Sequence, residues 1–152
     1  MARYFEDLEV GDTFEVGSYT VTKSEIVEFA EQFDPQPFHV DEAAAQASLF
    51  GELVASGLHT LCLSVRLFVT EFVTPDEGLA NMGGLGMDEL RWHQPVTPGE
   101  TLTLRIEVVE KTPSESKPDR GYVDFRRSVW NEEGEKLLSI VSHNIVRRRT
   151  EG

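Results

Sequence analysis

The sequence predicts an α+β fold in which a curled antiparallel sheet surrounds one long buried helix. Two observations lead to this prediction. The run from Ser56 to about Phe72 is apolar on nearly every side, which is typical of a helix buried on most of its faces. The second half of the chain holds three consecutive segments of alternating apolar and polar residues joined by short turns, which indicates antiparallel strands. A helix that is apolar all round needs such a sheet to cover it.

The first half of the chain is predicted to form one strand and one amphipathic helix. Residues Thr13 to Val21 are rich in β-branched and aromatic side chains and follow the turn-like pair Gly11-Asp12, so we expect a strand there. Thr22 and Glu25 have the spacing of a capping box, which starts a helix. The apolar residues of that helix recur at helical spacing and are expected to dock on the core; they are Ile26, Phe29, Ala30 and Phe33.

The helix is predicted to end at Asp34, because Pro35 follows it. Pro35 and Pro37 remove backbone donors and favour extended conformations before them, so we expect Asp34 and His39 to lie on a stiff loop. Asp41 and Glu42 then precede three alanines, which predicts a short helix that Gly51 ends.

The second half is predicted to supply the sheet. A glycine-rich loop is expected from Asp76 to Gly86, followed by a strand from Gly86 to Val96 and a turn over 97–100. Three strands should then follow in sequence. Their alternating apolar residues are Leu102, Leu104, Ile106 and Val108 in the first, Val123, Phe125 and Val129 in the second, and the segment Leu137 to Val146 in the third.

Length and composition indicate a soluble protein with a single domain, predicted over residues 1–152. The first ten residues are acidic where a signal peptide would be basic and then apolar. The longest apolar stretch, Leu58 to Val69, contains His59 and Arg66 and is too short to span a bilayer. The single cysteine, Cys62, cannot form an intrachain disulfide and fits a reducing compartment. We therefore expect a cytoplasmic protein with no membrane partner.

The net charge of −13, from 27 acidic and 14 basic residues, disfavours binding to nucleic acid or to anionic membranes. Two interpretations of the acidic surface remain open, an adaptation to high salt and an ordinary acidic cytosolic protein. An anionic substrate would need a local basic patch. The candidates are Arg91, Arg126, Arg127 and the run Arg147 to Arg149, although each of them also fits scattered surface charge.

Asp34 and His39 are the candidate catalytic residues. A carboxylate and an imidazole five residues apart on a rigid segment can handle protons together. Ser56-Gly57 opens the apolar helix, and a helix N-terminus presents free backbone N–H groups that stabilise an anion. These parts suit the addition of water to, or its removal from, a carbonyl compound.

Three motifs of the chain resemble the MaoC-like dehydratase family of hotdog-fold proteins, which contains the (R)-specific enoyl-CoA hydratases. The segment from Asp34 to Asp41 (DPQPFHVD) matches the hydratase motif of the family. Residues 55–57 (ASG) match its glycine at the start of the helix, and residues 89–99 (ELRWHQPVTPG) match its strand-and-turn signature. The chain departs from the family at Gln36, where asparagine is usual, and at Val65, where serine is common and Ser64 is adjacent.

The resemblance implies reversible addition of water to a 2-enoyl-CoA thioester. Asp34 and His39 would activate the water, and the Gly57 amide would stabilise the thioester oxyanion. The residues that would contact the acyl-CoA substrate are Gln36, Phe38, Ser56, His59 and Ser64, although His59 also fits a core histidine. The resemblance implies no cofactor beyond the CoA of the substrate. It also implies a homodimer, or a higher homo-oligomer, whose sheets join edge to edge.

Two other functions and a metal site are alternatives to this one. A hotdog thioesterase would hydrolyse the thioester, but that class usually carries its acid on the central helix. A non-catalytic acyl-CoA-binding protein would keep only the pocket. No metal is expected, because no second histidine occurs at ligand spacing beside His39. Cys62 is expected to pack in the core rather than act as a nucleophile.

Overall fold

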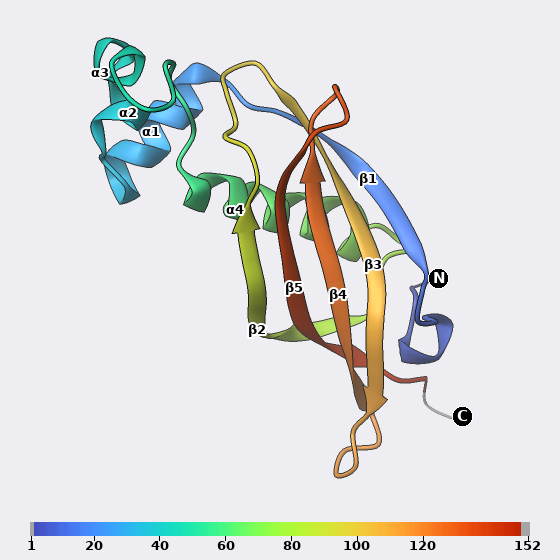
Figure 1. The fold of residues 1–152 in the computed structure, drawn as a ribbon. Coiled ribbons are helices and arrows are strands. Elements are labelled where there is room, and N and C mark those ends of the chain that lie inside the picture. The colour runs from blue at the N-terminus through green and yellow to red at the C-terminus, as the bar shows by residue number, and fades with distance from the viewer. Residues whose placement is uncertain (1, 150–152) are drawn as a thin grey trace.

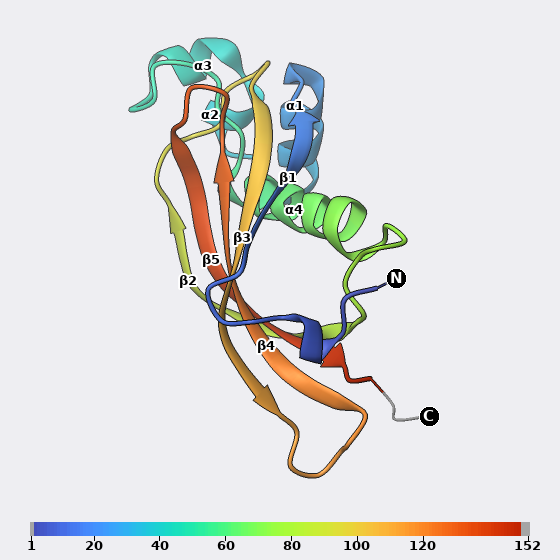
Figure 2. The same cartoon turned by 90° about the vertical axis from the view of Figure 1, so that its right-hand side faces the viewer.

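The protein has a five-stranded antiparallel sheet that curls around a helix, as Figure 1 shows for a computed structural model describing residues 2–149. The strands lie in the order β1 (Thr13–Thr20), β3 (Thr101–Pro113), β4 (Arg120–Trp130), β5 (Lys136–Arg147) and β2 (Asn81–Trp92). Helix α4 (Gly57–Leu67) lies on the concave side of the sheet (Figure 2). The predicted α+β fold is confirmed. Residues 1 and 150–152 of the predicted span lie outside the described part.

The core lies between the concave face of the sheet and the helix. From residue 102 to residue 108 of β3, every second residue is apolar and at most 1% exposed, namely Leu102, Leu104, Ile106 and Val108. Helix α4 continues into η2 (Phe68–Val73), a π-helical turn. The rings of Phe68 and Phe72 from this segment lie 5.7 and 6.0 Å from the ring of Phe125 on β4. Fully burying one such side chain contributes roughly 1.5–3 kcal/mol.

Helix α4 is covered on one side only, which differs from the prediction of a helix buried on most sides. Leu58, Val65 and Val69 are 45%, 36% and 39% exposed, and Cys62 is also exposed rather than packed. The sheet covers only the face that carries Leu63 and Leu67. The opposite face is therefore an apolar surface beside the edge of the sheet. Within residues 2–149 no helix is long and apolar enough to cross a membrane.

Three helices gather at one end of the molecule (Figure 1): α1 (Lys23–Phe33), α2 (Pro37–Val40) and α3 (Glu42–Gln46). The predicted capping box starts α1, since the N–H of Glu25 donates to Thr22 Oγ1 at 3.2 Å. Ile26 and Ala30 are buried as predicted, but Phe33 is 65% exposed and does not dock on the core.

Helix α2 stands where a loop was predicted. Pro37 occupies its first turn, where the missing N–H costs nothing and the fixed φ suits the helix. His39 therefore lies on a short helix rather than on a loop. Asp34, the C-cap residue of α1, lies just outside a helix end as predicted.

Strand β2 is the element that the sequence predicted least well. The glycine-rich segment from Asn81 to Gly86, predicted as loop, pairs with β5 as an edge strand, and the strand ends at Trp92 instead of Val96. The register shifts at three points along the pair, and Glu89 has φ of +55°. Pairing with β5 overrides the weak strand propensity of glycine, which sequence patterns cannot foresee.

Candidate active site

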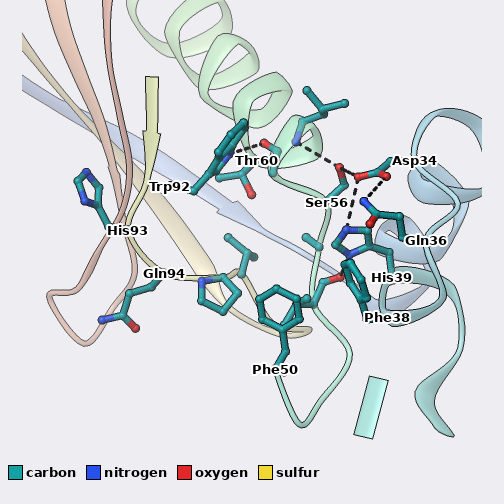
Figure 3. Close-up of a pocket in the computed structure, with 16 residues that line it drawn as sticks. Asp34, Gln36, Phe38, His39, Phe50, Ser56, Thr60, Trp92, His93 and Gln94 are labelled. Atoms are coloured by element: carbon teal, nitrogen blue, oxygen red, sulfur yellow. Dashed lines mark hydrogen bonds and ion pairs between the residues drawn. The ribbon is translucent and has the colours of Figure 1, made fainter. Parts of the chain in front are cut away.

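A cavity of about 450 Å³ lies where α1 and α2 meet the start of α4 (Figure 3). Six of the eight predicted site residues line it, namely Asp34, Gln36, Phe38, His39, Ser56 and Gly57. They come from the end of α1, from α2 and from the N-terminus of α4. Segments that are about twenty residues apart in sequence therefore converge on one cavity.

The Asp34 carboxylate is held by two donors. Ser56 Oγ donates to Oδ2 at 2.7 Å, and Gln36 Nε2 donates to Oδ1 at 2.7 Å. The hydrogen bond from Ser56, followed by that from Gln36, lowers the pKa of the Asp34 carboxyl below its usual range. Asp34 is therefore an oriented carboxylate at neutral pH. Ser56 and Gln36, predicted to contact substrate, line the cavity and also hold Asp34.

The His39 ring is fixed by a backbone carbonyl. Its Nδ1 lies 2.7 Å from the oxygen of Val54, and because a carbonyl only accepts, Nδ1 carries a proton. Nε2 of the neutral ring then has a lone pair, and it lies 3.4 Å from Asp34 Oδ2. His39 is only 5% exposed, so the orientation of its ring is tightly constrained. The imidazole and the carboxylate thus converge in the cavity (Figure 3).

Gly57 begins helix α4, and its N–H has no acceptor within residues 2–149. Ser56 is the N-cap residue, and its Oγ accepts from the N–H of Leu58 at 3.2 Å. A Cβ added at Gly57 would overlap the indole ring of Trp92, whose Nε1 donates to the Gly57 carbonyl at 2.9 Å. The close approach of Trp92 is therefore one physical reason for a glycine at the start of this helix.

Two predicted site residues lie elsewhere. His59 does not line the cavity; its ring stacks on Phe29 at 4.6 Å between centroids, and burial lowers its pKa. Ser64 is fully buried and donates to the carbonyl of Leu61 at 2.6 Å, one turn back along α4. Both side chains are buried, and each is engaged with a group outside the cavity lining. Their predicted contact with substrate does not fit these positions.

The cavity also has a wall that the sequence did not predict. It comes from the end of β2 and the segment after it, which contribute Trp92, His93, Gln94, Pro95 and Val96. His93 Nε2 lies 2.7 Å from Ser139 Oγ on β5. These residues belong to the signature ELRWHQPVTPG, which supported the family resemblance but did not indicate that they line the site. A strand running to Val96 would have turned alternate residues away from the cavity.

Among the described residues, no lysine or arginine lines the cavity. Three of the six predicted basic candidates, Arg126, Arg148 and Arg149, pair with acids elsewhere. Arg126 lies 3.3 Å from Glu107, and Arg148 lies 2.8 Å from Glu6. Likewise, no group of three or more His, Cys, Asp or Glu side chains suited to a metal ion occurs within residues 2–149.

Comparison with known proteins gives one family match and several relatives. The model of the family described as MaoC like domain matches residues 7–125. An uncharacterized protein of Bacillus subtilis, YdeM, is 32% identical over 133 residues, covering 88% of this chain and 91% of YdeM. The 3-hydroxybutyryl-CoA dehydratase of Methylorubrum extorquens is 34% identical over 112 residues, covering 72% of this chain and 66% of the dehydratase.

A solved structure has the same fold over nearly the whole chain. The MaoC-like dehydratase from Rhodospirillum rubrum superposes with a TM-score of 0.88 and is 41% identical. The match covers 98% of this chain and 99% of that one.

Proposed function

This chain belongs to the family of MaoC-like domains, and on that premise we propose that it adds water reversibly to the double bond of a 2-enoyl-CoA thioester. The observation that carries the proposal is the convergence of Asp34 and His39 in the cavity at the start of α4, with Nε2 and Oδ2 3.4 Å apart. The 3-hydroxybutyryl-CoA dehydratase relative gives independent support, because its reaction is the reverse of such a hydration.

In this proposal a single water molecule is held by Asp34 and His39. The Asp34 carboxylate accepts one of its hydrogens and so orients it. The unprotonated Nε2 of His39 takes the other proton as the water oxygen bonds to the β-carbon of the substrate. Two hydrogen bonds already lower the basicity of Asp34, which favours His39 as the base. General base help of this kind contributes typically about 10²–10⁴-fold.

Attack on the β-carbon moves the electrons of the double bond onto the thioester oxygen. We assign the Gly57 N–H to this oxyanion, because it has no acceptor within residues 2–149 and lies at a helix N-terminus. One such donor stabilises a developing oxyanion by roughly 3–4 kcal/mol. The protonated His39 then returns its proton to the α-carbon, which restores the neutral imidazole and completes the addition of one water.

The walls of the cavity favour an apolar acyl group. The apolar surface of the lining comes in part from Phe38, Phe50, Leu58, Pro95 and Val96. No cation among the lining residues is available to pair with a second carboxylate on the acyl chain. The proposed substrate is therefore an uncharged, apolar enoyl group, and no cofactor beyond its own CoA is needed.

We also propose that the protein is a homodimer joined at β2. This strand is an edge of the sheet, so a row of its backbone N–H and C=O groups is open to pairing. Exposed apolar side chains lie on the strand and on the neighbouring helix surface, namely Leu85 and Met87 on β2 with Val65 and Val69 on α4 and η2. A two-fold axis beside β2 would bury both features.

Crotonyl-CoA incubated with the protein tests the activity. A hydratase removes the conjugated double bond, so the ultraviolet absorbance of the enoyl thioester falls while no free thiol appears. Release of free CoA thiol at the same rate would identify a thioesterase instead. Binding of crotonyl-CoA with neither change would leave a non-catalytic acyl-CoA-binding protein and contradict the proposal.

A further inference from the structure

Arg127 is a buried cation on the concave face of the sheet. It lies on the same face of β4 as the core residues Phe125 and Val129, and only 2% of its surface is exposed. Its neighbour Arg126 points to the opposite face, is exposed and pairs with Glu107 at 3.3 Å. Two adjacent arginines of β4 therefore differ: the charge of Arg126 is paired with an acid at the surface, and Arg127 is buried.

The charge of Arg127 has no anionic partner among the described residues. Its Nε–H has no hydrogen-bond acceptor, and no ion pair within residues 2–149 involves its guanidinium. The guanidinium carbon lies 4.5 Å from the centre of the Phe68 ring, which offsets part of the desolvation. Burial lowers the pKa of Arg127 to about 10, so the group is still charged at neutral pH. A buried charge without a partner is unfavourable.

Arg127 lines a cavity of about 350 Å³ between η2, β2 and β5, which we call the Arg127 cavity. Its polar side contains a chain of hydrogen bonds. Ser142 Oγ donates to Asn144 Oδ1 at 2.9 Å, and Asn144 Nδ2 donates to Asn81 Oδ1 at 3.2 Å. The chain ends at the amide nitrogen of Asn81, which is a donor. Within residues 2–149, neither the Nε–H of Arg127 nor the side-chain amide of Asn81 donates to an acceptor.

A second basic residue of the lining, His143, differs from Arg127 because acids already satisfy it. Its Nδ1 lies 2.7 Å from Asp124 and its Nε2 lies 2.6 Å from Asp88, and these contacts raise the pKa of the imidazole. Arg127 is thus the uncompensated cation of this cavity. The remaining wall is apolar and partly exposed. Val65 and Val69 lie beside the edge strand, and Met87 lies on it.

We propose that the Arg127 cavity binds a carboxylate that enters between η2 and the edge strand β2. A guanidinium forks onto a carboxylate with two parallel hydrogen bonds, and the apolar wall accommodates the aliphatic carbons that carry the carboxylate. This chemistry has two sources, a free aliphatic carboxylate and an Asp or Glu side chain of a second copy docked along β2. The site is separate from Asp34 and His39, so it stands or falls independently of the hydratase activity.

Thermal unfolding with added butanoate tests the first source. Wild type and Arg126→Met, the matched control, are expected to gain a saturable rise in Tm of roughly 3–6 °C at ten times the dissociation constant. Arg127→Met should show no such rise, although without ligand it should be at least as stable as wild type, because an unpaired buried charge is removed. Arg127→Lys, which keeps the charge but not the fork, should show a smaller rise and serves if the methionine variant does not fold.

Sedimentation over a range of protein concentrations tests the second source. If a second copy supplies the carboxylate, butanoate has little effect, and Arg127→Met weakens the dimer at least about tenfold whereas Arg126→Met does not. The proposal is overturned if Arg127→Met equals wild type in both measurements, or if chloride at the same ionic strength reproduces the butanoate effect. A protein that stays monomeric at every concentration and ignores butanoate contradicts both the site and the dimer.

Discussion

The two oxygens of the Asp34 carboxylate have different hydrogen-bond donors, and this fixes how the carboxylate is presented. Ser56 and Gln36 each donate to a different carboxylate oxygen, while the Val54 carbonyl fixes His39 from behind. Gln36 reaches Asp34 at 2.7 Å, so the longer amide side chain still engages the carboxylate. Residue identity at positions 36 and 56 therefore affects the orientation and basicity of the Asp34 carboxylate.

Ser56→Ala should shift the acid limb of the pH profile of kcat/KM upward. The acid limb reflects both groups that must be unprotonated, the His39 base and the Asp34 carboxylate. Removing the Ser56 donor raises the pKa of Asp34, so the part of the limb that Asp34 contributes moves to higher pH. A hydrogen bond to a charged group is worth roughly 1.5–3 kcal/mol, so the shift should be about one pH unit or more. Ser64→Ala, which removes another buried serine of the same segment, should leave the limb in place. Equal profiles for the two variants would refute the assignment.

At the residue level the sequence predicted a shared site for Asp34 and His39 but not the groups that hold them in place. The Asp-x₄-His spacing and the flanking prolines are visible in a single chain, and these two side chains do converge. The acceptor for His39 is the backbone oxygen of Val54, fifteen residues away, and a backbone contact leaves no trace in residue identity. His59 and Ser64 were placed wrongly, because proximity in sequence to Gly57 does not fix which side of a helix faces the cavity.

The start of α4 is shaped by the end of β2. The Trp92 indole lies against the position that a side chain at 57 would occupy and donates to the Gly57 carbonyl. Trp92 also lines the cavity, so one contact positions both the helix N-terminus and a wall of the site. The two elements are 35 residues apart in sequence, which is why the glycine could be predicted as a helix start without its packing role.

Gly57→Ala should destabilise the protein through this contact, by about 1–3 kcal/mol in urea unfolding, because the new methyl group overpacks against the ring. Trp92→Ala removes the obstacle, so adding Gly57→Ala to a Trp92→Ala background should cost little further stability. Additive losses in the double variant would show that the methyl group clashes with something other than Trp92.

For the molecule as a whole, the α+β arrangement was predictable because it rests on strong patterns. Alternating apolar residues mark β3, β4 and β5, which form most of the sheet, and a long apolar run marks α4, the helix that packs against it. Strand β2 was partly missed because its glycines gain their strand conformation only from pairing with β5. The apolar run of α4 predicted a helix buried on most sides, but a single sheet covers one side and leaves Val65 and Val69 exposed.

The uncovered side of α4 connects two proposals, the homodimer joined at β2 and the carboxylate site in the Arg127 cavity. Three features adjoin one another: the edge strand β2, the exposed face of α4 with η2, and the Arg127 cavity. The chain as a whole carries a net charge of −13. A second copy would cover the apolar face, and its carboxylates are abundant enough to meet Arg127. The cavity with Asp34 and His39 has a different lining, so changes at one site should leave the other intact.

The most direct measurement for the shared-water account is a double-mutant cycle on the hydration of crotonyl-CoA with Asp34→Asn, His39→Gln and the combined variant, each first shown to be folded. If the two side chains act on one water, each single change lowers kcat by about 10²-fold or more, and the combined variant is at most a few-fold slower than the slower single variant. Near wild-type activity in either single variant, or a loss in the combined variant equal to the product of the single losses, would contradict the account.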